Sequence, residues 1–274
     1  INHALTNVST GGFSTKQASI AHFTSPLIQY IIILFMFIGG INFTLIYFGA
    51  KLKFRKFIKN DEFKWFICAI PFLLLIIFPL VNQVSENNFE TSFRYALFQI
   101  MSIITGTGYS TADFTTWGAF ATFIFFLLMF SGASAGSTTG GVKIVRIGLL
   151  IKNTALEFKR RLHPNAIIPV QLNGNVVSPK IIYNLLAFVF FYLFIFVSGS
   201  IVLTFIGLDF KDAVGASATA ISNVGPGIGS LGPSSSFAHL PDAAKWVLSF
   251  LMILGRLELF TIVILFTPYF WRRN

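Results

Sequence analysis

The sequence predicts an all-α polytopic membrane protein with repeated helix–pore-loop–helix modules around one pore and a broken helix at residues 131–141. Composition is the first observation behind this prediction, because 54% of the 274 residues are hydrophobic and only 11% are charged. Soluble domains carry about 25% charged residues. The second observation is a series of long apolar runs joined by basic loops. The third is a glycine motif that occurs near the start, the middle and the end of the chain.

The glycine motif places glycine among hydroxyl and small residues directly before a long apolar segment. Glycine adopts positive φ without steric cost, so a strand of this kind can point successive carbonyls the same way. A ring of carbonyls can replace the water around a bare cation. The motif therefore predicts one wall of an ion-selectivity filter, although any single copy could be an ordinary turn between two helices. The copies are residues 9–15 (Ser-Thr-Gly-Gly-Phe-Ser-Thr), 105–109 (Thr-Gly-Thr-Gly-Tyr) and 222–227 (Ser-Asn-Val-Gly-Pro-Gly).

The first copy of the motif precedes a pair of apolar segments. Residues 26–50 are mainly apolar and long enough to cross a bilayer core of ~30 Å. A cluster of basic residues follows, and residues 63–81 then return across the membrane, with Pro71 and Pro79 as positions where that helix could kink. Ile1 falls where the repeat expects a short helix, so at least one half-module is expected upstream.

Two further segments are too short to span a membrane. Residues 89–103 are expected to dip into the membrane as a half-helix whose C-terminal, negative dipole end faces a cation site. Residues 211–222, which are rich in small side chains, are expected to do the same before the last copy of the motif. A polar link at residues 162–180 leads into a predicted span at residues 181–206, and another predicted span at residues 243–271 follows the second half-helix.

The apolar stretch 117–150 has an unusual middle, because residues 131–141 are all small and include four glycines. Such a sequence does not hold a lipid-facing helix, and irregular backbone survives at membrane depth only inside protein or beside water. We therefore expect the break to line the pore and to act as a gate beneath the filter. Its proposed members are Gly132, Gly136, Gly140 and Gly141, with Lys143 just beyond them.

Arg256 lies about halfway along the predicted last span. An arginine at the bilayer centre costs at least ~2.5 kcal/mol on insertion scales, so it must face a cavity or a partner. An ion pair with Glu258 is one alternative, but side chains two residues apart on a helix point to nearly opposite faces. We therefore expect Arg256 to face the pore as part of the gate.

Basic residues set the expected topology. Fifteen of the 20 Lys and Arg residues fall in the connection after the first span, in residues 143–180 or at the C-terminus. The positive-inside rule makes that side cytoplasmic and places the filter on the outer side. The net charge of +10 is thus explained without a nucleic-acid partner. The expected modules are residues 1–50, 63–161 and 162–274.

These motifs together resemble the Trk/Ktr/HKT superfamily of potassium transporters, closest to its TrkH-type potassium uptake subunit. Further similarities are Gly-Ser-Thr-Thr-Gly-Gly-Val-Lys at residues 136–143 and Gly-Arg-Leu-Glu-Leu-Phe-Thr at residues 255–261, where Glu258 favours the Trk branch. The resemblance implies a potassium uptake permease, not an enzyme, in the cell (inner) membrane. The implied filter is Ser9, Thr10, Gly11, Gly12, Thr105, Gly106, Thr107, Gly108, Ser222, Asn223, Val224 and Gly225, with K⁺ as the ion bound there.

The resemblance also implies four modules around one pore, of which residues 1–50 would be the end of the second, 63–161 the third and 162–274 the fourth, with the first module absent. It further implies no covalent cofactor, a homodimer in the lipid bilayer and a cytoplasmic nucleotide-binding regulatory subunit. The basic segments 51–64 and 143–180 face the side on which such a subunit would dock, although positive-inside loops alone would also look this way. Three alternatives stay open: a sodium-coupled or sodium-conducting transporter of the same fold, a carrier for another solute, and a membrane-embedded enzyme. The last lacks any convergent set of nucleophile, base or metal ligands.

Overall fold

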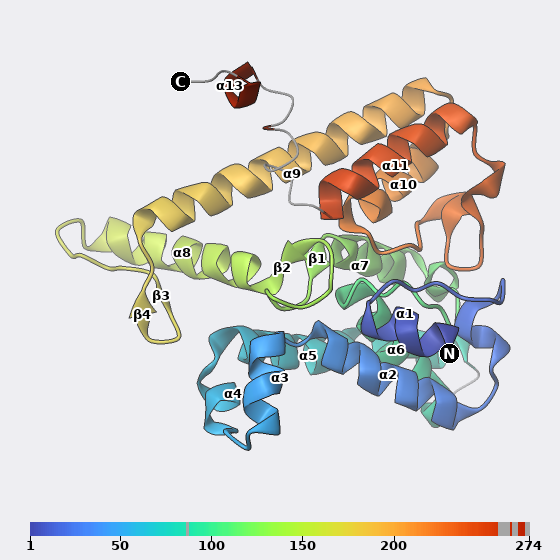
Figure 1. The fold of residues 1–274 in the computed structure, drawn as a ribbon, viewed down its shortest axis with the longest axis horizontal. Helices are drawn as coiled ribbons and strands as arrows, with labels where there is room; N and C mark the ends of the chain where they lie inside the picture. Colours follow the sequence, from blue (N-terminus) through green and yellow to red (C-terminus); the bar gives the residue numbers. More distant parts are fainter. Residues whose placement is uncertain (86–87, 257–263, 265–267, 272–274) are drawn as a thin grey trace.

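The computed structural model describes residues 1–85, 88–256, 264 and 268–271, and it is predominantly helical. Figure 1 shows α2, α5 and α6 on one side of the molecule, α9, α10 and α11 on the other, and β1, β2 and α7 between them. The α-helices are α1 (Asn2–Val8), α2 (Pro26–Gly40), α3 (Phe43–Ala50), α4 (Arg55–Lys59), α5 (Asp61–Val84), α6 (Phe89–Ile104), α7 (Ala119–Met129), α8 (Ile144–Leu162), α9 (Pro179–Phe205), α10 (Phe210–Ser222), α11 (Asp242–Arg256) and α13 (Pro268–Trp271). Short 3-10 helices are η1 (Ser19–His22), η2 (Phe114–Trp117), η3 (Gly229–Leu231) and η4 (Phe237–His239).

Two described helices are long and apolar enough to cross a membrane, α5 with 24 residues and α9 with 27. At 1.5 Å per residue each exceeds the ~30 Å core of a bilayer. The helix α5 begins at Asp61, two residues before the predicted span, because the side chain of Asn60 caps it by accepting the N–H of Phe63 at 2.8 Å. It continues as one helix through Pro71 and Pro79.

Residues 26–50 do not form one straight span. The chain breaks between α2 and α3, whose axes differ by 106°. Asn42 starts the second helix, since its side-chain oxygen accepts the N–H of Thr44 at 2.9 Å. Gly40 lies where a Cβ would come 2.9 Å from the Phe66 ring, so close packing against α5 fixes the chain at this point. Neither contact can be read from hydropathy.

The two short helices α6 and α10 lie inside the molecule. Ile100 and Ile103 of α6 are fully buried in a core shared with α2 and α5. Ala213 and Ala216 of α10 are fully buried in a second core with α9 and α11, where small side chains allow close approach of the helices. The C-terminal parts of both helices are enclosed by protein and are therefore well placed to hold a loop at that end.

A loop separates α7 from α8, and we call residues 131–141 the break loop. Helix α7 ends at Met129 and α8 begins at Ile144. The parallel pairing of β1 (Ser131–Gly132) with β2 (Val142–Lys143) closes the ends of the break loop, which lies between the two halves of the molecule in Figure 1.

The C-terminal half differs from the prediction in one detail. The polar link 162–180 contains a small antiparallel hairpin of β3 (Gln171–Leu172) and β4 (Asn175–Val176). Of the predicted last span at residues 243–271, the structure describes α11, Ile264 and α13, and Glu258 lies outside the described residues.

Candidate functional site

Each of α1, α6 and α10 leads directly into one copy of the glycine motif. We call residues 9–12, 105–108 and 222–225 the first, second and third glycine segments. All three turn back on their helix in the same way, because the N–H just before the shared glycine donates to a carbonyl five residues earlier. These bonds are Gly11 to Thr6 at 2.7 Å, Thr107 to Ser102 at 2.9 Å and Val224 to Thr219 at 3.2 Å.

The glycine segments share a backbone pattern as well. The shared glycines Gly12, Gly108 and Gly225 have φ of +66°, +79° and +110°. Two residues before each of them, φ is again positive, at +51° for Thr10, +61° for Gly106 and +55° for Asn223. Glycine reaches this region freely, whereas Thr and Asn occupy it only when surrounding contacts hold them there. The three segments are therefore structurally equivalent.

The glycine segments also touch one another. A Cβ built on Gly12 would overlap the carbonyl oxygen of Thr107 in the second segment. A Cβ built on Gly108 would likewise overlap the carbonyl oxygen of Val224 in the third. The first segment thus packs on the second and the second on the third, with the shared glycines at the points of contact. Any larger residue would separate the backbones.

Hydroxyl side chains behind the segments were not predicted as site residues. Six residues before each shared glycine stand Thr6, Ser102 and Thr219. Thr6 donates to the carbonyl of Phe13 at 3.0 Å, and Ser102 donates to the carbonyl of Tyr109 at 2.5 Å, so each bond reaches the residue after the shared glycine. Thr219 instead accepts the N–H of Gly225 at 2.9 Å. The signal in the sequence is that a hydroxyl recurs at the same offset in every copy.

The other predicted members lie at the helix ends, and two of them, Ser222 and Asn223, are bonded to neighbouring helices. Thr105 is fully buried and its hydroxyl lies 2.8 Å from that of Thr107. The hydroxyl of Ser222 lies 2.8 Å from that of Tyr192 on α9, and the Asn223 amide donates to the carbonyl of Met252 on α11 at 3.0 Å. The hydroxyl of Ser9 donates to the carbonyl of Thr6 over a long distance of 3.5 Å.

The break loop lies against these segments. The hydroxyl of Thr10 donates to that of Thr138 at 3.1 Å, which joins the first segment to the loop. A Cβ on Gly140 would come 2.5 Å from the carbonyl oxygen of Ser222, so the loop backbone also packs on the third segment. Gly106 lies near as well, since a Cβ there would be 3.6 Å from the amide nitrogen of Gly140.

Glycine is required inside the break loop for two different reasons. Gly136 and Gly141 have φ of +74° and +66°, which favours glycine. Gly132 has no room for a side chain, because a Cβ there would overlap the carbonyl oxygen of Gly140. The predicted gate glycines are thus brought together in one closed loop.

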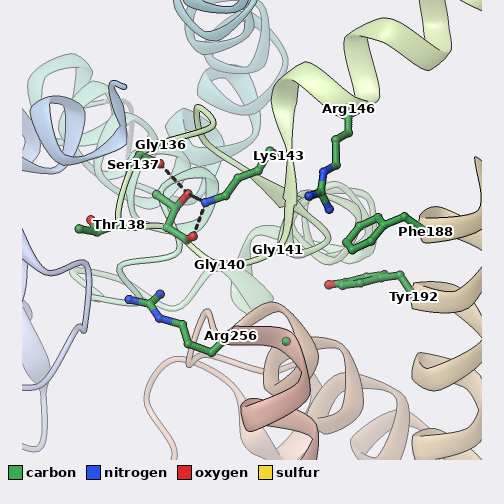
Figure 2. Close-up of a pocket in the computed structure, with 12 residues that line it drawn as sticks. Gly136, Ser137, Thr138, Gly140, Gly141, Lys143, Arg146, Phe188, Tyr192 and Arg256 are labelled. Carbon is green, nitrogen blue, oxygen red and sulfur yellow. Dashed lines mark hydrogen bonds between the residues drawn. The ribbon is translucent and has the colours of Figure 1, made fainter. Parts of the chain in front are cut away.

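A cavity of about 350 Å³ opens beside the break loop (Figure 2). Its lining includes the loop residues 136–141 together with Phe188 and Tyr192 of α9 and three basic side chains. Lys143 points back into the loop, where its ammonium donates to the hydroxyl of Thr139 at 2.8 Å. Arg146 stacks on Phe188, with 4.0 Å between its guanidinium carbon and the ring centroid.

Arg256 is the third basic residue of the cavity. It is the last residue of α11, and Figure 2 shows its side chain extending toward the break loop at Thr138 and Gly140. Close packing sets this position, because a Cβ on the preceding Gly255 would overlap the carbonyl oxygen of Ile221 at the end of α10. Among the described residues Arg256 forms no ion pair, and its alternative partner Glu258 lies outside them.

The site therefore consists of three equivalent glycine segments, an irregular loop packed on them and a basic cavity at that loop. Residues 1–273 match the family model TrkH, described as a cation transport protein. The chain belongs to the TrkH family. This confirms the resemblance that the sequence motifs indicated.

Relatives in this family match almost the whole chain. The Trk system potassium uptake protein TrkH of Vibrio parahaemolyticus is 36% identical over 277 residues, which cover 99% of this chain and 56% of that protein. TrkH of Escherichia coli is 35% identical over 278 residues, again 99% of this chain and 56% of the relative. The crystal structure of the potassium transporter TrkH from Vibrio parahaemolyticus superposes with a TM-score of 0.92 at 36% identity, covering 99% of this chain and 58% of that one. The chain thus spans a little over half the length of these relatives.

Proposed function

We propose that the protein containing this TrkH-family chain is a potassium uptake permease, and that the three glycine segments are walls of its selectivity filter. One observation carries the proposal: Gly12, Gly108 and Gly225 share a positive φ, and the segments around them pack directly on one another. Backbone carbonyls held in this way can replace the hydration shell of a cation. The relatives named above are potassium uptake proteins, which supports K⁺ as the ion.

In this proposal the modules are residues 1–50, 63–161 and 162–274, each with a pore loop formed by its short helix and glycine segment. The C-terminal ends of α6 and α10 direct the negative end of their dipoles at the filter, which favours a cation there. The basic connections face the cytoplasm of a cell (inner) membrane and the filter faces outward. A homodimer and a cytoplasmic nucleotide-binding subunit belong to the same proposal.

The break loop and Arg256 form the proposed gate. Gly132, Gly136, Gly140 and Gly141 allow the loop to run across the pore below the glycine segments, where it lacks bulky side chains to relocate. Arg256 and Lys143 line the cavity that the loop borders. A fixed positive charge ~4 Å from a cation path raises the barrier by on the order of 1–4 kcal/mol, depending on the local dielectric. Moving the loop and Arg256 together would lower that barrier.

The test is a flux measurement on the full-length protein in liposomes. Rubidium uptake, and patch-clamp currents with potassium on one side and sodium on the other, give rate and preference together. The proposal expects saturable rubidium flux and a reversal potential that favours potassium. Equal permeability to sodium would support the sodium-conducting alternative, and absence of any cation flux in a folded, reconstituted protein would refute the permease.

A further inference from the structure

A buried carboxylate lies directly against the break loop. Glu62, in the first turn of α5, is only 6% exposed, and its side chain accepts a hydrogen bond from the backbone N–H of Ala135. A charged group is rarely buried unless its hydrogen bonds and charge are satisfied. Here the acid is bonded to the backbone of the loop, so its position and that of the loop depend on each other.

The backbone carbonyl of Ala135 is hydrogen-bonded as well. The side-chain amide of Asn42 donates to the carbonyl of Ala135, while the oxygen of the same amide caps α3. Both backbone groups of Ala135 are therefore bonded to side chains, one from α5 and one from the bend between α2 and α3. Losing either partner would remove a hydrogen bond from a partly buried backbone group, which is costly.

Backbone bonds extend this attachment to the residues on either side. Ser134 donates its N–H to the carbonyl of Gly40 at 3.1 Å. Gly136 accepts the N–H of Phe43 at 3.2 Å. Residues 134–136 are thus fixed to the bend between α2 and α3 as well as to α5, and we call them the anchored half of the break loop.

Residues 137–141, the C-terminal part of the loop, line the cavity together with Gly136 and Arg256. Their described bonds are to other parts of the loop, to Lys143, to the first glycine segment and to the end of α1, where the hydroxyl of Thr138 donates to the carbonyl of Val8 at 3.3 Å. Within the loop, the hydroxyls of Ser137 and Thr139 lie 2.9 Å apart. Lys143 also attracts the Glu62 carboxylate electrostatically. The two charges thus attach to opposite halves of the loop, Glu62 at Ala135 and Lys143 at Thr139.

We propose that Glu62 is a positioning residue of the gate, whose carboxylate fixes the anchored half of the break loop so that residues 137–141 rest across the pore. This inference rests on the proposed function of the loop as a gate. Removing the acceptor frees Ala135 and lets the loop leave its resting position, so the gate opens more often. Glu62 itself touches no ion path and acts only through the loop backbone.

Four variants of the full-length protein separate this role from a general structural one. Glu62→Gln keeps an oxygen acceptor and removes the charge, whereas Glu62→Ala removes both. Glu62→Asp keeps the charge but withdraws the carboxylate oxygens from Ala135 by the length of one methylene. It replaces Glu62→Ala as the test variant if the alanine variant does not fold. Asp61→Ala is the matched control, because Asp61 is the adjacent acid but binds Lys152 at 3.0 Å and the N–H of Asn173 at 3.1 Å, away from the loop.

Two readouts are measured in nanodiscs or liposomes: hydrogen–deuterium exchange of the peptides covering residues 131–141, and rubidium uptake. Glu62→Ala and Glu62→Asp are expected to raise loop exchange about tenfold and flux several-fold, the aspartate variant less. Glu62→Gln and Asp61→Ala are expected to stay within about twofold of the unmodified protein in both readouts.

The outcomes distinguish the inference from the proposal beneath it. Unchanged loop exchange in both Glu62→Ala and Glu62→Asp overturns the positioning role, and so does a Glu62→Gln variant that behaves like the alanine variant. Faster loop exchange without a change in flux also overturns it, provided that Arg256→Ala does raise flux, because the gate then exists without needing Glu62. If neither Arg256→Ala nor faster loop exchange alters flux, the proposed gate itself is wrong, and the positioning role is overturned with it.

Discussion

Gly108→Ser tests the filter assignment most directly, because Gly108 is the middle of the three contact points. At φ +79° an L-residue is strained by roughly 1–2 kcal/mol. The new Cβ would also overlap the carbonyl oxygen of Val224, so either the second or the third glycine segment must shift. Overpacking of this kind costs typically about 1–3 kcal/mol. Much of that strain is relieved by displacing a carbonyl that the proposal assigns to the filter.

We therefore expect Gly108→Ser to lower the preference for potassium over sodium by tenfold or more, since ~1.4 kcal/mol corresponds to a factor of ten. The assay is the reversal potential of the reconstituted full-length protein under potassium–sodium gradients, with rubidium uptake as a measure of rate. Gly106→Ser is the matched control in the same segment. Its added Cβ would meet nothing closer than 3.6 Å, and the equivalent positions already hold Thr10 and Asn223 at positive φ.

The control is expected to keep most of the potassium preference, because Thr10 and Asn223 show that a side chain at this position fits the segment without moving a neighbouring backbone. If Gly108→Ser keeps both the flux and the preference of the unmodified protein, the second glycine segment is not a filter wall. If Gly106→Ser loses as much preference as Gly108→Ser, the contact with Val224 is not the cause and the steric reasoning is wrong.

Three further predictions concern the gate and the support of the filter. Arg256→Ala should raise rubidium uptake about tenfold, since a nearby fixed charge adds on the order of 1–4 kcal/mol to the barrier, while Arg256→Lys should change the uptake less. A folded alanine variant that conducts no faster would make Arg256 a structural residue. Deleting residues 137–139 should raise open-state flux, and an intact fold with unchanged flux would reduce the break loop to a packing feature. Ser102→Ala removes the bond to the Tyr109 carbonyl and should lower potassium preference several-fold in reversal-potential measurements. Ser102→Thr should preserve the potassium preference, because Thr6 and Thr219 occupy the equivalent places. Equal preference in both variants would show that these hydroxyls are not part of the site.

Much of this architecture follows from local properties of the sequence. Hydropathy and length predict the helices α5 and α9, because burying apolar side chains in a bilayer needs no knowledge of their neighbours. The small residues 131–141 predict an interrupted helix for the same reason. Gly12, Gly108 and Gly225 could be singled out because positive φ is a property of one residue's own backbone.

Other features depend on groups that are distant along the chain. Hydropathy predicts one span at residues 26–50, yet tertiary contacts at Gly40 and Asn42 turn the chain by 106°. The hydroxyls behind the glycine segments recur visibly in the sequence, but their role appears only when each is seen bonded to its strand.

Glu62 illustrates the limit of sequence most clearly. As an acid in the first turn of a helix it resembles any favourable N-terminal residue, since negative charge is stabilised there. Its bond to Ala135 joins residues 73 positions apart, and no local pattern encodes that pairing. Sequence therefore determined which segments are apolar, which break and which can adopt positive φ, because those are properties of single residues and their immediate neighbours. The tertiary structure alone decided which buried donor meets which acceptor, because that depends on how the helices pack.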